Sequence, residues 1–156
     1  MNGCFGCDVA NPAGLGMTFS LDSQGRLAAS CRPGEQHRGL GRIVNGGLVT
    51  TFAEELAAAA AGAKGDGGLV VTRVEVNYER PTYVGAELRG VVTSTTREKK
   101  VVSVSVDVIG DAGRIAVMNA TFLLMSEERL RELAGIGLEA APACLLAGRQ
   151  LLPAEI

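Results

Sequence analysis

Residues 45–64 read NGGLVTTFAEELAAAAAGAK, and this stretch decides the fold. It opens on two glycines and then contains neither Gly nor Pro until Gly62, while its second half is rich in alanine, the residue with the highest helix propensity. Leu48, Phe52 and Leu56 follow the spacing of a helix face, and the other positions before Lys64 carry mostly small apolar residues and no Lys or Arg. The sequence therefore predicts one long helix that other elements cover on nearly every side.

Two carboxylates, Glu54 and Glu55, lie in the middle of this apolar helix. A carboxylate taken out of water without a partner costs on the order of several kcal/mol, so we expect at least one of them to face a cavity, a second copy or a ligand. Helical spacing places on one flank the residues Thr50, Thr51, Glu54, Ala58 and Ala61. This flank is the candidate site, and its small residues suit close approach by another surface.

Length, charge and cysteine content narrow the class of protein. A chain of 156 residues has the size of one domain, and its formal charge of −2 gives no basic surface for nucleic acid. The most apolar window contains two glutamates and falls short of the roughly 20 residues that a membrane span needs. Four cysteines without a signal-peptide pattern indicate reduced thiols in the cytoplasm. We expect a cytoplasmic protein with neither nucleic-acid nor membrane partners.

The N-terminal segment, residues 1–16, contains Gly, Asn-Pro and Ala-Gly steps and is interpreted as a loop. Cys4 and Cys7 form a C-x-x-C pair, which is compatible with half of a zinc site or with a redox pair. Cys31 and Cys144 are isolated in sequence, and no strand and helix flank the pair as a thioredoxin-like site requires. We therefore expect no metal and no cofactor, and treat Cys4 and Cys7 as small residues in a folded turn.

After the helix the hydrophobic period changes from 3.6 to 2, which predicts strands. Residues 70–78 alternate as a strand with one face turned inward, and the short connections that follow predict an antiparallel sheet. The further predicted elements are a hairpin at 17–21 and 26–31, strands at about 86–96, 101–109 and 114–125, and a short helix at 126–134. Residues 135–156 form an apolar C-terminal extension that should pack on something. We expect a single domain over 1–156.

The loop at residues 32–42 is polar and rich in glycine, and it leads directly into the long helix. It carries His37, the only histidine of the chain, whose imidazole titrates near neutrality and could serve catalysis. A single histidine in such a loop is more often solvent-exposed. Both interpretations remain open from the sequence.

Three motifs occur in a fixed order along the chain. Residues 41–48, GRIVNGGL, followed by Glu54, are similar to a G-x-x-x-H-G-G signature with a helix carboxylate nine residues after the histidine. Residues 77–81, NYERP, with Gly85, resemble an N-Y-x-R-P…G motif, and an N-terminal C-x-x-C…N-P-x-G-L occurs in some relatives. Over residues 4–125 the chain thus resembles the acyl-CoA thioesterases of the hot-dog superfamily, close to the phenylacetate-degradation and 4-hydroxybenzoyl-CoA branch.

The resemblance implies an α+β hot-dog fold, in which an antiparallel sheet wraps around one long central helix. It implies hydrolysis of an acyl-CoA thioester to free acid and CoA, with the carbonyl polarised at the helix start and a carboxylate acting as general base or nucleophile. The implied catalytic residues are Glu54, Asn45, Gly46 and Gly47, and the implied substrate-binding residues are His37, Thr50, Thr51, Thr72 and Arg80. Asn45 stands where the family has histidine, and an amide cannot take a proton at neutral pH.

The helix start and Glu54 are about two turns apart, roughly 10 Å, which is too far for both to reach one thioester carbon. In the family a second subunit resolves this, so the resemblance implies a homodimer or a homotetramer built as a dimer of dimers. Two alternatives remain. One is a non-catalytic hot-dog protein that binds acyl-CoA or another ligand. The other is a hot-dog hydratase or dehydratase, which needs a histidine with an acidic partner.

Overall fold

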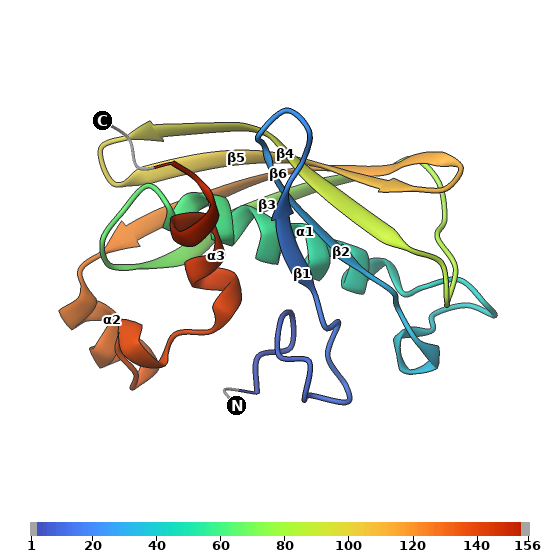
Figure 1. The fold of residues 1–156 in the computed structure, drawn as a ribbon, viewed down its shortest axis with the longest axis horizontal. Helices are drawn as coiled ribbons and strands as arrows, with labels where there is room; N and C mark the ends of the chain where they lie inside the picture. The colour runs from blue at the N-terminus through green and yellow to red at the C-terminus, as the bar shows by residue number, and fades with distance from the viewer. Residues whose placement is uncertain (1–2, 154–156) are drawn as a thin grey trace.

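The structure is a computed structural model that describes residues 3–153. Its strands and helices are β1 (Thr18–Leu21), β2 (Leu27–Cys31), α1 (Gly46–Gly62), β3 (Gly68–Tyr78), β4 (Leu88–Glu98), β5 (Val101–Gly110), β6 (Gly113–Met125), α2 (Glu127–Ala134) and α3 (Ala143–Leu151). The strands form one antiparallel sheet in the order β1-β2-β4-β5-β6-β3, and α1 lies along one face of it (Figure 1). The predicted hot-dog arrangement is confirmed.

The core lies between α1 and the inner face of the sheet. Phe52 and Leu56 of α1 are fully buried, and alternate residues of β5 meet them from the sheet, namely Val102, Val104, Val106 and Val108. Gly90 of β4 allows this close packing, because a Cβ at that position would lie 2.8 Å from side-chain atoms of Phe52 and Leu56. The alternating apolar residues of the strands and the apolar face of α1 thus pack together in one layer.

Strand β3 differs from its prediction. It forms one edge of the sheet and pairs on one side only, with β6. The expectation of a strand with one buried face is wrong within the single chain: only Gly68 is buried, and Val70, Val74 and Tyr78 are exposed at 42%, 38% and 53%. The described chain therefore presents an apolar edge strand, a feature that soluble proteins ordinarily cover or pair.

The C-terminal extension packs on the central helix of its own chain. Helix α3 lies against the second half of α1, and Gly148 sits so close that a Cβ there would be 2.0 Å from the backbone oxygen of Ala59. Ala58 and Ala61 are consequently 9% and 0% exposed. The prediction that they form an open flank for a second copy is wrong, because the extension already covers that end of the helix.

Substitution of Gly148 tests this packing. Alanine favours helices, but here its methyl group would meet a backbone oxygen that cannot move aside, so the clash outweighs the propensity. We expect Gly148→Ala to lower the free energy of unfolding by about 2 kcal/mol or more in urea denaturation. Gln150→Ala, at an exposed position of the same helix, is the control and should change it by less than about 0.5 kcal/mol.

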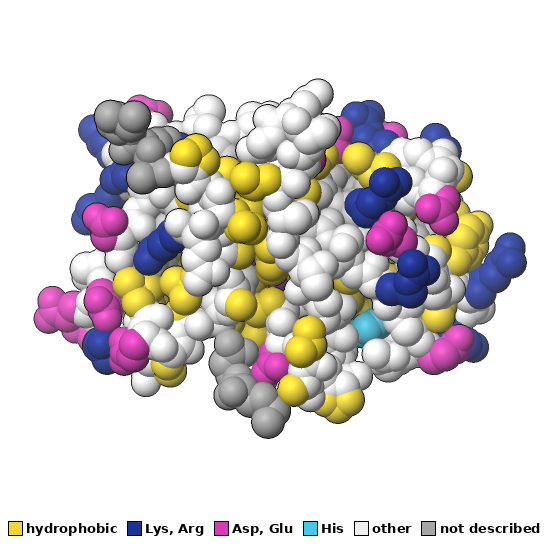
Figure 2. All heavy atoms as spheres, viewed as in Figure 1, with side chains coloured by type: hydrophobic (Ala, Val, Ile, Leu, Met, Phe, Trp, Pro, Cys, Tyr) yellow, Lys and Arg dark blue, Asp and Glu magenta, His cyan; other side chains and the backbone are white. Residues whose placement is uncertain are grey.

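The surface carries charges of both signs. On the face shown in Figure 2, charged side chains gather toward the two ends of the molecule, and hydrophobic side chains form a band between them. Within residues 3–153, no helix is both long and apolar enough to cross a membrane.

Candidate active site

Glu54 lies at the middle of α1 with its side chain half-buried. No residue among 3–153 gives its carboxylate a hydrogen bond or an ion pair. Burial, and secondarily the charge of Glu55, raises the pKa of Glu54 to about 7. The expectation of a desolvated carboxylate with a pKa near neutrality is therefore confirmed.

Glu55 points to a different part of the molecule. Its side chain lies beside the Cys144 thiol, whose pKa it helps to raise, and packs against Gly6, where a Cβ would lie 2.8 Å from Glu55 carbons. The two neighbouring carboxylates of α1 thus face different surroundings. Of the two, Glu54 is the one left for a ligand or a second copy.

The start of α1 is exposed and capped by its own asparagine. The Asn45 side-chain oxygen accepts a hydrogen bond of 2.8 Å from the Gly47 N–H. The Gly46 N–H has no acceptor among residues 3–153, and it lies at the positive end of the helix dipole. The donors left for a ligand are consequently the Gly46 N–H and the Asn45 amide nitrogen, rather than the Gly47 N–H.

Tyr78, at the end of β3, was not singled out as a site residue. Its O–H donates to the Gly46 carbonyl at 2.8 Å, and its oxygen also hydrogen-bonds the Thr50 hydroxyl. This contact holds the edge strand β3 beside the first turn of α1. The N-Y-x-R-P motif was the sequence signal that could have pointed to it.

A depression of 320 Å³ lies beside this helix start. Gly46, Tyr78 and Arg80 line it, together with Ile43, Val44, Val49, Glu79, Pro81, Thr82 and Ile115. Arg80 is exposed and donates to the Ala112 carbonyl at 2.7 Å. The structure therefore brings five of the predicted site residues, Asn45, Gly46, Gly47, Thr50 and Arg80, to one end of α1.

Two other predicted hydroxyls bond to backbone carbonyls. Thr51 donates to the Gly47 carbonyl within α1 at 2.9 Å. Thr72 lies at a β-bulge of β3 and donates to Thr121 on β6 at 3.1 Å. Thr51 shares the helix flank of Glu54, whereas Thr72 lies away from the helix start, further back along β3.

His37 is only 2% exposed, so the interpretation as a solvent-exposed loop histidine is wrong. Its Nδ1 accepts from the Gly34 N–H at 3.0 Å, which leaves Nε2 to donate to the Ala13 carbonyl, also at 3.0 Å. Both ring nitrogens are engaged by backbone groups. His37 thus fastens the N-terminal segment to the loop before α1, and no nitrogen remains for a substrate.

The flank of α1 that carries Glu54 and the start of α1 make two half-sites. The first offers a base with a pKa near neutrality, and the second offers hydrogen-bond donors that can hold an oxyanion. Acyl transfer to water requires both kinds of group around one carbonyl. A single copy keeps them about two helical turns apart.

One family model matches the middle of the chain. The model of the "Thioesterase superfamily" matches residues 41–117, which contain both half-sites and the strands that frame them. This matched region, just under half of the chain, carries the sequence pattern of the thioesterase superfamily. Among curated proteins, none matches this chain at a significant level.

Solved structures share the hot-dog fold of this chain. A mutant of the phenylacetic acid degradation protein PaaI from Thermus thermophilus is 20% identical, with a TM-score of 0.63 over 71% of this chain and 95% of that one. The thioesterase HI1161 from Haemophilus influenzae is 15% identical, with a TM-score of 0.64 over 77% and 85%. The BH2602 protein from Bacillus halodurans, solved with CoA, is 20% identical, with a TM-score of 0.59 over 67% and 71%.

Proposed function

We propose that this protein hydrolyses an acyl-CoA thioester to the free acid and CoA, in a site formed by two copies of the chain. One observation carries the proposal: Glu54 is a half-buried carboxylate with a pKa of about 7 and no partner within residues 3–153 of its own chain, on the helix that the superfamily model covers. The structure of BH2602 with CoA supports a CoA thioester as the class of substrate.

In the proposed reaction Glu54 acts as general base. A pKa near 7 suits proton transfer at neutral pH, which favours this role over direct attack by the carboxylate. Water adds to the thioester carbonyl carbon and gives its proton to Glu54. The Gly46 N–H and the Asn45 amide stabilise the oxyanion. The C–S bond then breaks, and the CoA sulfur takes the proton back from Glu54.

The second copy supplies the missing half-site. A two-fold pair presents the same surface on both subunits, so a helix start can face the Glu54 of its neighbour twice. The edge strand β3 supports such a pair, because it exposes Val70, Val74 and Tyr78 and lies beside the first turn of α1. We propose a homodimer, or a homotetramer built from two such dimers, with acyl-CoA as the small-molecule partner.

A panel of acyl-CoA thioesters, assayed by release of the CoA thiol, tests the proposed function. We expect turnover of at least one aromatic or aliphatic acyl-CoA by the wild-type chain. Tight binding of every panel member without thiol release would favour a non-catalytic binding protein instead. A hydratase is disfavoured, because His37, the only histidine, has both nitrogens bonded to backbone groups.

The pH dependence of kcat/KM tests the role of Glu54. A general base works only when ionised, so activity should be low below the pKa and should rise to a plateau above it. We expect the rising limb to be centred near pH 7, as the raised pKa of Glu54 predicts. A profile that shows no rise around neutral pH would contradict the assignment.

A further inference from the structure

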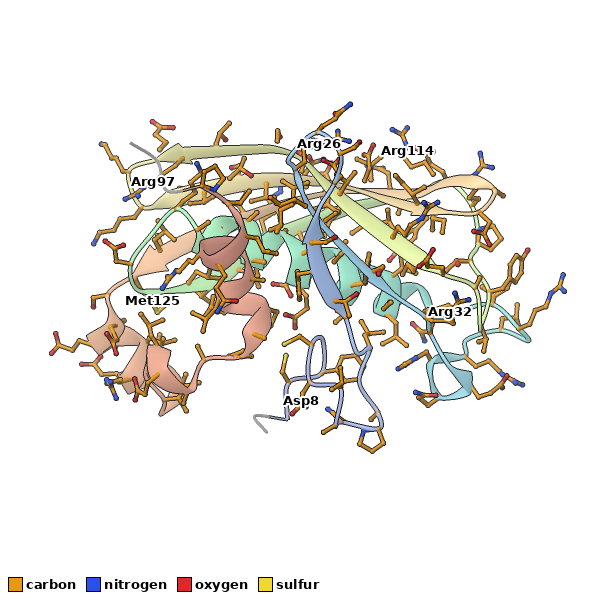
Figure 3. The ribbon with its side chains drawn as sticks, viewed as in Figure 1. Asp8, Arg26, Arg32, Arg97, Arg114 and Met125 are labelled. Atoms are coloured by element: carbon orange, nitrogen blue, oxygen red, sulfur yellow. The ribbon has the colours of Figure 1, made fainter. Side chains whose placement is uncertain are left out.

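The described residues contain a cluster of three thiols outside the candidate active site. The Sγ atoms of Cys4, Cys7 and Cys144 all lie within 4.8 Å of one another. Cys144 is isolated in sequence but not in space, because the chain folds back and places α3 beside the N-terminal loop that carries Asp8 (Figure 3). We propose that Cys4, Cys7 and Cys144 bind a zinc ion that ties the two ends of the chain together.

The distances suit tetrahedral coordination. Zinc–sulfur bonds of about 2.3 Å at tetrahedral angles place two sulfurs about 3.8 Å apart. Cys4 Sγ lies 3.2 Å from Cys7 Sγ and 3.5 Å from Cys144 Sγ. These two pairs therefore need to open by about 0.3–0.6 Å to admit the ion, and the third pair, Cys7 Sγ and Cys144 Sγ, lies within 4.8 Å.

Three sulfurs favour a metal over a disulfide. A disulfide joins two cysteines at about 2.05 Å and would leave the third thiol of the cluster unused. All four cysteines are reduced in the structure, and the fourth, Cys31, is buried on β2. A soft divalent ion such as zinc uses every member of the cluster.

Backbone groups support negative charge on the sulfurs. The Cys7 N–H donates to Cys4 Sγ at 3.4 Å, and the Cys144 N–H donates to Cys7 Sγ at 3.2 Å. Cys144 is the second residue of α3, so its N–H is one of the donors that a helix start leaves without an intrahelical acceptor. Such hydrogen bonds stabilise thiolates that ligate a metal.

The fourth coordination position has room for water. Cys4 and Cys7 line an open cavity of 810 Å³, whose other lining residues include Asp8, Ile136 and Ala143. Binding replaces three thiol protons, which leave to solvent, with one divalent ion. The protein thus supplies three sulfur ligands, and a water on the cavity side completes the tetrahedron.

The ion would act as a cross-link. Cys4 and Cys144 are 140 residues apart, so a metal held by both restricts the unfolded chain over nearly its whole length. It would also hold the N-terminal loop and α3 in place beside α1. The inference is independent of the proposed hydrolysis, because no ligand belongs to the candidate active site.

Metal content of the purified full chain is the direct test. After expression in zinc-supplemented medium, we expect about one zinc per chain in the wild type by plasma mass spectrometry. Cys144→Ala and Cys4→Ala should each fall below about a tenth of that, whereas Cys31→Ala should keep the wild-type content. After exchange for cobalt, a thiolate-to-cobalt charge-transfer band should appear in the wild type and in Cys31→Ala alone.

Thermal unfolding gives a second readout. A chelator should lower the melting temperature of the wild type and Cys31→Ala by roughly 5 °C or more, and should leave Cys144→Ala unchanged. The proposal is overturned if the wild type carries no zinc and added zinc does not raise its melting temperature. It is equally overturned if thiol titration of the denatured wild type finds a disulfide between Cys4 and Cys7.

Discussion

Glu54→Gln is expected to lower kcat for acyl-CoA hydrolysis by about 10²- to 10⁴-fold, the contribution of a positioned general base. The amide keeps the size of the side chain and cannot accept the proton of water. Because Glu54 is half-buried and its carboxylate has no partner within residues 3–153, the neutral amide should not reduce stability. Steady-state kinetics with the best acyl-CoA of the panel, together with a melting curve, check both statements.

Glu55→Gln is the matched control. It changes the same residue type one position along α1, but its side chain contacts Cys144 and Gly6 on a different side of the helix. We expect kcat to stay within about threefold of the wild type, since the side chain lies outside both half-sites. If Glu55→Gln abolished turnover and Glu54→Gln did not, the proposed catalytic residue would be wrong.

Val74→Lys is expected to separate the subunits and to remove activity with them. Val74 is 38% exposed on the edge strand β3, where a charged side chain prevents pairing with another copy. Separated subunits keep the base and the oxyanion donors apart, so kcat/KM should fall by a factor similar to that of Glu54→Gln. Size-exclusion chromatography with light scattering measures the state of assembly beside the kinetics.

Val101→Lys is the control for this experiment. Val101 is exposed to a similar extent, 42%, but begins β5 inside the sheet, beside the Lys99-Lys100 turn. The Val101→Lys substitution should leave both the state of assembly and the activity unchanged. A monomeric wild type with full activity would refute the shared site.

Much of the fold was predictable because it depends on local periodicity. The alanine-rich stretch at residues 45–64 predicts the helix observed as α1 (Gly46–Gly62), and alternation predicts β5 and β6. The turn-rich segments between them allow only antiparallel neighbours. The N-cap at Ser126 was also predicted from the sequence. In the structure its hydroxyl accepts a hydrogen bond from the Arg129 N–H at the start of α2.

What the sequence did not reveal depends on contacts between distant segments. The exposure of β3 follows from its place at the edge of the sheet. The alternation of residues within one strand does not reveal the order of the strands in the sheet. His37 is buried because Ala13, 24 residues earlier, accepts its Nε2–H. Cys144 joins Cys7 across 137 residues, a pairing that no local spacing encodes.

The candidate site was predictable to the same degree. Position along α1 identified Glu54 as a desolvated carboxylate, and its burial confirms this. Which hydrogen-bond donors at the start of α1 remain available for a ligand could not be predicted, because this depends on the orientation of the Asn45 side chain. The catalytic and binding roles of these residues stay predictions.

Complementation between two inactive variants tests the shared site most directly. Gly46→Pro removes the Gly46 N–H and suits the first helical position, because Asn45 already has the extended ψ of 128° that precedes proline. Glu54→Gln removes the base. In hybrid dimers of the two variants, one of the two sites contains an intact Gly46 and an intact Glu54.

Each variant alone should be nearly inactive. An equimolar mixture, unfolded and refolded together, should recover about one quarter of the wild-type activity, because half of randomly formed dimers are hybrids with one good site each. A mixture no more active than its components, in samples where mass spectrometry finds hybrid dimers, would contradict a site built from two copies.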